Sequence, residues 1–147
     1  MTEPRIIACP HCHRRNRLPA DKPASVAHCG GCKQLLFEGR PLELSASNLD
    51  AHLRSDMPLL VNFWAPWCGP CLAFAPTFQQ AAQQLEPHVR LAKVNTETEP
   101  ALAHRFAIRS IPTLILFQHG QELARINGAL PAQQLHQWVQ QHLPVSV

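Results

Sequence analysis

Apolar and polar positions follow two different periods along residues 41–147, and each period predicts a different element. The run Pro58–Trp64 is almost entirely apolar, which is typical of a strand buried on both faces. From Cys68 onward, apolar residues recur at three- and four-residue spacing, and glutamines occupy the opposite positions. This spacing predicts an amphipathic helix that contains one proline, Pro76. The apolar positions of the predicted helix are Leu72, Ala75, Phe78, Ala82 and Leu85.

The apolar positions in the rest of residues 41–147 predict further strands that alternate with helices. Val89–Val94 alternates as a strand, and Pro112–Phe117 with Glu122–Asn127 predicts a β-hairpin around the loop 118–121. The predicted helices are Leu49–Leu53, Glu99–Phe106 and a final amphipathic segment at Leu135–Leu143. Strands alternating with helices predict an α/β fold, with a central mixed β-sheet flanked by helices on both faces.

Residues 1–40 are organised differently from the rest of the chain. They lack long apolar runs, are interrupted by prolines and glycines, and hold four of the six cysteines. So few apolar side chains do not offset the conformational entropy lost on folding. This segment therefore either has a covalent or metal cross-link or stays disordered. We therefore predict two domains, a small one at 1–40 and an α/β domain at 41–147.

Composition limits the class of protein. The chain has 147 residues, of which 46% are hydrophobic and 16% charged, so it can bury a sizeable core and is not extensively disordered. The longest apolar runs hold seven residues, whereas a membrane helix needs about 20, and no secretory signal is visible at the N-terminus. We expect a cytoplasmic location, where paired cysteines more often serve metal or redox chemistry than structural disulfides.

Charge is concentrated at the N-terminal end. Residues 1–40 hold seven basic and three acidic residues, whereas the remainder holds six basic and seven acidic residues. The excess positive charge is compatible with an acidic partner. However, the basic run is short and poor in aromatic residues, so we expect no nucleic-acid binding.

Cys68 and Cys71 lie where the predicted buried strand gives way to the predicted helix. A cysteine at a helix N-terminus faces unsatisfied N–H groups and the positive end of the helix dipole, which favour the thiolate. Cys71 follows one turn later on the same face. We therefore expect Cys68 to be an exposed attacking thiolate and Cys71 a shielded resolving thiol. The alternative is a zinc-binding or inert structural pair, which lacks a second cysteine pair nearby in the same segment.

Residues 41–147 resemble thioredoxin along their whole length. The matching residues are Trp67-Cys68-Gly69-Pro70-Cys71, Phe63-Trp64-Ala65, Lys93, Ile111-Pro112-Thr113, Gly120 and Gly128-Ala129. The resemblance implies a thioredoxin fold and protein disulfide reductase activity supported by Trp67, Gly69, Pro70 and Lys93. It also implies a cis Ile111–Pro112 bond and a substrate groove, which is formed by Trp67, Ile111, Pro112, Gly128 and Ala129.

The resemblance also implies partners. These are disulfide-containing protein substrates and an NADPH-dependent flavoprotein thioredoxin reductase. The chain has no glycine-rich dinucleotide loop, so we expect it to bind neither flavin nor nicotinamide itself. We expect a monomer that contacts no membrane.

Asn62 is a departure from the thioredoxin pattern. Thioredoxins usually carry a buried aspartate at this position, and its carboxylate is thought to take the proton of the second cysteine. An amide does not titrate and is therefore no general base. We expect slower resolution by Cys71, a lower thiol pKa and a proton route through Lys93 and water.

Cys9/Cys12 and Cys29/Cys32 form two further C-x-x-C pairs separated by 16 residues. This spacing is typical of a structural zinc site with four thiolate ligands, which would also supply the missing cross-link. A second redox centre is the alternative, but we expect neither an apolar strand before Cys9 nor an amphipathic helix after Cys12. A zinc ribbon ahead of a thioredoxin domain, with Phe37-Glu38-Gly39 after the second pair, resembles the bacterial thioredoxin 2 group.

Two other functions remain open at this point. One is an interaction module, in which a basic ribbon surface binds an acidic partner and the thioredoxin domain is a scaffold. The other is a redox switch, in which oxidation of the ribbon thiols releases zinc. The basic residues of the first alternative are Arg14, Arg15, Arg17 and Lys33.

Overall fold

A computed structural model describes residues 3–143 and contains two β-sheets. The larger sheet has the strand order β3-β5-β4-β6-β7; β3, β4 and β5 are parallel, whereas β6 is antiparallel to both β4 and β7. The smaller sheet is an antiparallel hairpin of β1 and β2. The strands are β1 Arg5–Ala8, β2 Arg15–Leu18, β3 Leu42–Glu43, β4 Leu59–Trp64, β5 Arg90–Asn95, β6 Thr113–Gln118 and β7 Gln121–Asn127. The helices are α1 Leu49–Leu53, α2 Gly69–Leu85, α3 Pro100–Arg105 and α4 Ala132–His142, with a 3₁₀ turn at Ala24–Val26.

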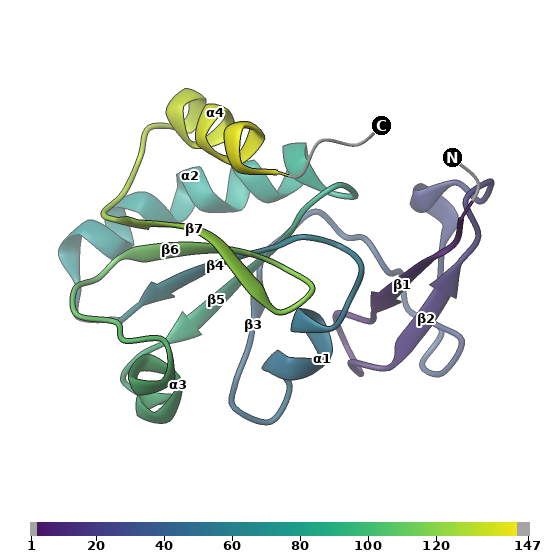
Figure 1. The fold of residues 1–147 in the computed structure, drawn as a ribbon, viewed down its shortest axis with the longest axis horizontal. Coiled ribbons are helices and arrows are strands. Elements are labelled where there is room, and N and C mark those ends of the chain that lie inside the picture. Colours follow the sequence, from purple (N-terminus) through teal and green to yellow (C-terminus); the bar gives the residue numbers. More distant parts are fainter. Residues whose placement is uncertain (1–2, 144–147) are drawn as a thin grey trace.

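Helices cover both faces of the five-stranded sheet (Figure 1). On one face, Phe74 and Phe78 of α2 and Trp138 of α4 pack against Leu60 of β4. On the other face, α1 and α3 pack around a second apolar cluster that includes Phe63. Successive residues of β4 therefore belong to opposite cores, as the continuous apolar run predicted, and the α/β fold is confirmed. No helix within residues 3–143 is long and apolar enough to cross a membrane.

The hairpin of β6 and β7 is tighter than the sequence predicted. Both strands extend by one residue into the expected loop, which leaves only His119 and Gly120 between them. Their φ angles are +50° and +78°. Two consecutive positive φ angles are characteristic of the two-residue turns that match the right-handed twist of a hairpin, and Gly120 adopts this conformation without strain.

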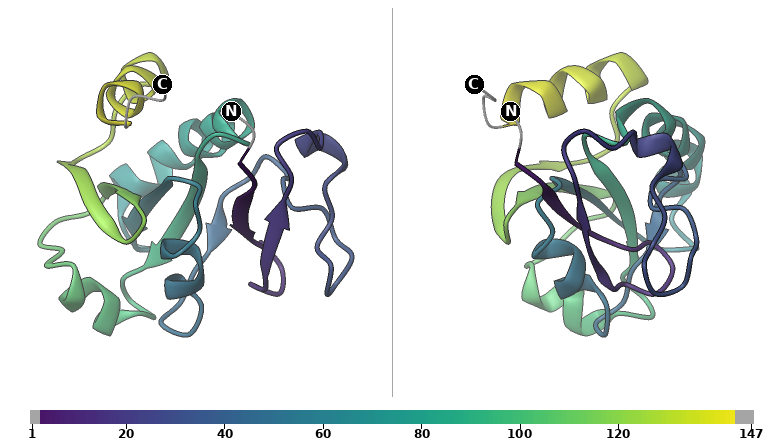
Figure 2. Two further views of the ribbon diagram at one scale, coloured as in Figure 1. Left: turned by 45° about the vertical axis from the view of Figure 1, so that its right-hand side comes forward. Right: turned by 90° about the vertical axis from the view of Figure 1, so that its right-hand side faces the viewer.

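The hairpin β1–β2 is the main element that the sequence did not predict. Strand β1 leads directly into Cys9, so the expectation that no strand precedes this residue is wrong. The strand is only four residues long, too short to show a period. It forms because Ile7 is fully buried with Leu36 and Met57. Figure 2 shows the hairpin standing beside the five-stranded sheet rather than joining it.

A buried ion pair attaches the N-terminal segment to the larger sheet. The Arg90 guanidinium lies 2.6 Å from the Glu86 carboxylate, donates to the Ala8 carbonyl at 3.1 Å and lies 5.3 Å from the centre of the Phe37 ring. The second Glu86 oxygen accepts the Gly39 N–H at 2.8 Å. Both charged side chains are almost completely buried, so each relies on the other and on these backbone groups for compensation.

We expect Arg90→Met to lower the free energy of unfolding by about 3–5 kcal/mol, because the Glu86 carboxylate would remain buried without its partner. Urea denaturation at neutral pH measures this change. The matched control is Arg105→Met, which removes an exposed pair with Asp50 and should cost less than about 1 kcal/mol. The double variant Glu86→Gln/Arg90→Met should recover part of the loss. Equal effects of Arg90→Met and the control would contradict this account.

Candidate functional site

Cys68 and Cys71 form a disulfide at the start of α2. Cys68 is the N-cap residue of the helix, and its sulfur accepts the Cys71 N–H at 3.2 Å. Pro70 occupies the first turn, where its missing N–H leaves no helix hydrogen bond unmade. The sulfur of Cys68 therefore faces the positive end of α2, as the sequence predicted for a cysteine at this junction.

Burial does not distinguish the two cysteines in the disulfide form. Cys68 is 4% exposed and Cys71 is 2% exposed, and both pack with Ala65 and the partly buried Trp64. The expected exposure of Cys68 is thus not found in this state. The exposed group is Trp67, which is 69% accessible and directly precedes the disulfide. A protein partner that reaches the sulfurs would therefore meet this indole.

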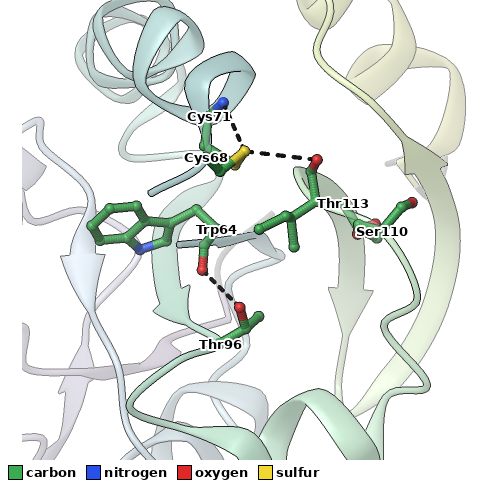
Figure 3. Close-up of a disulfide and its surroundings, with 7 residues drawn as sticks. Trp64, Cys68, Cys71, Thr96, Ser110 and Thr113 are labelled. Carbon is green, nitrogen blue, oxygen red and sulfur yellow. Dashed lines mark hydrogen bonds between the residues drawn. A yellow bond between two sulfur atoms is a disulfide. The ribbon is translucent and has the colours of Figure 1, made fainter. Parts of the chain in front are cut away.

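The peptide bond Ile111–Pro112 is cis, which confirms the prediction from the family resemblance. The Ile111 carbonyl oxygen lies 3.8 Å from the Cys68 sulfur. Gly128 donates its N–H to the Pro112 carbonyl at 2.8 Å, which brings the chain after β7 to the same place, and the next residue, Ala129, is exposed. Figure 3 shows Trp64 on one side of the disulfide and Thr113, just after the cis bond, on the other.

Asn62 lies on β4, two residues before Trp64 and on the same face of the strand. It is 2% exposed, and its Oδ1 has no hydrogen-bond partner among the described residues. Lys93 is its register partner on β5, and the Lys93 ammonium lies 4.9 Å from the centre of the Trp64 ring. The Asn62 amide and the Lys93 ammonium therefore lie on the adjacent strands β4 and β5, and Asn62 is on the strand that leads to the disulfide.

Cys9, Cys12, Cys29 and Cys32 converge in the N-terminal segment, with all four sulfurs within 4.8 Å of one another. Two of the separations are 3.6 Å, between Cys9 and Cys32, and 3.5 Å, between Cys12 and Cys29. Sulfurs around a tetrahedral zinc ion with Zn–S bonds of about 2.3 Å lie about 3.8 Å apart. The cluster therefore fits a single zinc ion with little rearrangement.

Backbone N–H groups surround the sulfurs of this cluster as well. The Cys9 sulfur accepts the N–H of His11 at 3.3 Å, and the Cys29 sulfur accepts the N–H of Gly31 at 3.3 Å. Burial raises the pKa of Cys29. The N–H of Cys32 and the Asn16 side chain, among other donors, outweigh this effect and lower the pKa to about 6. Burial outweighs the N–H groups at Cys9 and raises the pKa of that thiol to about 12. The turn at Cys29 thus favours a thiolate, the form that binds a metal ion, whereas Cys9 would give up its proton on binding the metal.

The three histidines near the cluster make contacts elsewhere. His11 pairs with Glu38, and His28 contacts the Val26 carbonyl. His13 lies 2.9 Å from the buried His52 of α1, ring nitrogen to ring nitrogen. Burial, Arg90 and His13 together lower the pKa of His52 to about 3. The group of side chains that could hold a metal ion here therefore consists of the four cysteines.

Sequence reasoning missed the pairing of Glu86 with Arg90. An acid and a base four residues apart are usually an exposed helical pair, and here Pro87 lies between them. The signal that was available is Arg90 itself, a charged residue at the beginning of a strand whose other residues are mostly apolar. It also missed Glu43, one of the two residues of β3, because so short a strand shows no period.

Comparisons with known proteins agree with this geometry. Residues 40–141 match the family described as Thioredoxin. Over 139 residues the chain is 45% identical to Thioredoxin C-3 of Corynebacterium nephridii, which covers 94% of this chain and 95% of that protein. It is 48% identical over 91 residues to Thioredoxin 1 of Nostoc sp. PCC 7120, covering 62% of this chain and 85% of that protein.

A solved structure is similar as well. A mutant thioredoxin from Halobacterium salinarum NRC-1 superposes with a TM-score of 0.68 at 25% identity and covers 76% of this chain and 97% of its own. Thioredoxins exchange disulfides without a flavin or nicotinamide of their own. Fold, disulfide position and relatives agree, and the chain belongs to the thioredoxin family of thiol–disulfide oxidoreductases.

Proposed function

We propose that the chain is a thioredoxin 2-like protein disulfide reductase in which Cys68 attacks and Cys71 resolves. The observation that carries this assignment is the position of the Cys68 sulfur at the N-cap of α2, where the Cys71 N–H points at it. Negative charge on a thiolate is stabilised there. Cys71 lies one turn inside the helix, at a Cα–Cα distance of 5.2 Å from Cys68.

The reaction proceeds by two thiol–disulfide exchanges. The Cys68 thiolate attacks one sulfur of a substrate disulfide, and the other substrate sulfur leaves as a thiolate, which takes up a proton. Cys71 then loses its proton and attacks the Cys68 sulfur, so the second substrate thiol is released and the Cys68–Cys71 disulfide closes. A thioredoxin reductase returns two electrons to this disulfide, since family members are reduced in this way.

The surroundings of the disulfide support binding of an extended substrate segment. The Ile111 carbonyl faces the Cys68 sulfur, and the cis bond and the Gly128–Pro112 hydrogen bond hold this loop in place. Trp67 offers an exposed aromatic surface, and Ala129, the other expected groove residue, is exposed as well. Gly69 and Pro70, between the cysteines, are exposed, whereas both cysteines are almost completely buried in the disulfide form.

The N-terminal segment is a zinc ribbon in this proposal, with Cys9, Cys12, Cys29 and Cys32 as ligands. Zinc would replace the core that residues 1–40 lack, because its binding energy becomes folding energy. The proposed division is a ribbon at 1–40 and a thioredoxin domain at 41–147, working in the cytoplasm on disulfide-containing proteins. The sulfur separations and the N–H groups directed at Cys9 and Cys29 support it.

Cys68→Ser should abolish the reduction of insulin disulfides, because no other thiol occupies the N-cap position of α2. Cys71→Ser should instead trap a covalent mixed disulfide with the substrate, since the attacking thiol remains and the resolving one is gone. Insulin turbidity and non-reducing gels measure the two outcomes. Inactivity of the wild type would favour the alternative interaction module, and full activity of Cys68→Ser would contradict the assignment of the nucleophile.

Metal analysis of the reduced protein should find one zinc ion per chain and two free reactive thiols, because four thiolates are held by the metal. Cys29→Ser should lose the zinc and make residues 1–40 sensitive to proteolysis, while insulin reduction continues. The matched control is Ser25→Ala, an exposed change in the same segment. Six reactive thiols and no metal in the freshly purified protein would contradict the zinc assignment.

Asn62→Asp should move the pH profile of Cys68 alkylation to higher pH by about one unit, because a buried carboxylate disfavours a nearby thiolate. The same variant should speed resolution by Cys71 at neutral pH, since it adds a proton acceptor. Iodoacetamide alkylation and insulin turnover, each measured from pH 5 to 9, test the two effects. Asn62→Ala adds no carboxylate and is the control. An unchanged profile and turnover in Asn62→Asp would contradict this role of Asn62.

A further inference from the structure

Glu43, Lys93 and Asn62 form a row across three parallel strands. Glu43 of β3 is the register partner of Lys93 of β5, which is in turn the register partner of Asn62 of β4. Partners in a parallel sheet project to the same face. Two residues earlier, Leu60 and Leu91 are also partners, and both belong to the cluster beneath α2. The row therefore projects to the face that α2 covers.

The row passes from the buried centre of the sheet to its solvent-exposed edge. Asn62 is buried with its Oδ1 unpartnered, Lys93 is half-buried, and Glu43 is exposed as a whole residue at the edge strand. The Glu43 carboxyl group is nevertheless partly desolvated, and this burial raises its pKa, with Lys93 and the Trp64 indole acting in the opposite direction. A carboxylate with a raised pKa is a better proton acceptor near neutral pH.

Trp64 connects this row to the disulfide. Its ring packs against the cluster that contains both cysteines, and the Lys93 ammonium lies over the same ring. Its Nε1–H is buried without a hydrogen bond of standard geometry, although it is near enough to Glu43 to influence that carboxyl group. Asn62 Oδ1 and Trp64 Nε1 thus belong to adjacent positions on the α2-facing side of β4, the first without any partner and the second directed toward Glu43 without a standard hydrogen bond. Buried polar atoms of this kind are normally satisfied by water.

Among the described residues of β3, β4, β5, β6 and α2, Glu43 is the one carboxylate that projects to this face. Among the described residues, α2 carries no acidic or basic side chain, and the α2-facing positions of β4, β5 and β6 offer the amide of Asn62 and the ammonium of Lys93 but no acid. Glu43 and Lys93 do not form an ion pair within 4.0 Å in this part of the chain, so both remain available to water.

We propose that Glu43 is a positioning residue of the resolving step and that, through water held at Asn62, Trp64 and Lys93, its carboxylate accepts the proton that Cys71 loses. Neighbouring strands lie about 4.8 Å apart, so Glu43 is two strand spacings from Asn62 and acts through water rather than by contact. The Cys71 thiolate then displaces the substrate thiolate from Cys68, the substrate takes a proton from solvent, and Glu43 returns its proton to solvent. This inference rests on the proposed roles of Cys68 and Cys71.

The test separates attack from resolution with the chromogenic disulfide 5,5′-dithiobis(2-nitrobenzoate). Attack by Cys68 releases the first nitrothiobenzoate, and resolution by Cys71 releases the second, so stopped-flow absorbance resolves two phases. A Cys68→Ser/Cys71→Ser variant measures the background from the ribbon thiols, which is subtracted. Glu43→Gln should slow the second phase about threefold to tenfold between pH 6 and 7.5 and leave the first unchanged. The difference should vanish toward pH 9, where hydroxide accepts the proton.

Two controls identify the cause. Asp50→Asn removes a carboxylate from α1, on the opposite face of the sheet, and should leave both phases unchanged. In an Asn62→Asp background, Glu43→Gln should change the second phase less than twofold, because the new carboxylate supplies the acceptor directly. A structural role of Glu43 would slow the second phase equally at all pH values and in both backgrounds.

The outcomes distinguish this inference from the proposed function. If wild type shows no two-phase release, the roles of Cys68 and Cys71 fail and the inference fails with them. If wild type shows both phases and Glu43→Gln matches it from pH 6 to 7.5, the reductase assignment stands and the role of Glu43 is overturned. Thermal unfolding of each variant verifies that the kinetic comparison is made between folded proteins.

Discussion

The hydrogen bond from the Cys71 N–H to the Cys68 sulfur is the contact on which the chemistry of this protein depends. It exists because β4, the central strand of the sheet, ends at Trp64 and α2 begins at Gly69, so that Cys68 is the N-cap residue of the helix. The positive end of a helix dipole stabilises a thiolate only within about the first turn. The junction of β4 and α2 thus determines where the nucleophile can be.

The rest of the fold keeps that turn in place. The apolar face of α2 packs on Leu60 and its neighbours, which fixes the direction of the helix, and the cis Ile111–Pro112 loop closes the space on the other side of the disulfide. The far end of α2 meets the N-terminal segment at the buried Glu86–Arg90 pair. A helix of 17 residues is about 25 Å long, so this attachment lies far from the disulfide at the other end of α2. The proposed ribbon therefore contacts the end of α2 and the start of β5 rather than the residues around the disulfide.

Much of the thioredoxin domain was predictable from sequence because its elements are long enough to show a period. The strand at Pro58–Trp64 and the helix after Cys68 were each identified from the spacing of apolar residues. The sheet was then inferred from the order of strands and helices along the chain. The hairpin β1–β2 was not predictable in this way. Its four-residue strands are stabilised by tertiary contacts of Ile7 and by the convergence of four cysteines, and neither leaves a periodic signal.

The site residues also include some with a local sequence signal and some that depend on contacts between distant segments. Motif spacing located both sets of cysteines, because helix and turn geometry fix the positions of residues three apart. The cis bond came from the family resemblance, since an X-Pro pair before a strand has an ordinary reading from sequence alone. The expected exposure of Cys68 is not found in the disulfide form, in which this residue packs with Ala65 and Trp64. Contacts between distant segments, such as Arg90 with Ala8, lay beyond any local pattern.

Asn62 shows why one buried position affects both steps of the exchange in opposite directions. A carboxylate at this position would raise the free energy of the Cys68 thiolate and slow attack, but it would also accept the proton of Cys71 and speed resolution. An amide removes both effects together. In this chain the carboxylate lies instead at Glu43, at the sheet edge and two strands away, where solvent and Lys93 weaken its field at Cys68. A proton can cross that distance through water, whereas the electrostatic penalty on the thiolate falls with distance and with solvent screening. The separation of the acid from the sulfurs therefore allows a low thiolate energy and a proton acceptor to exist in the same site.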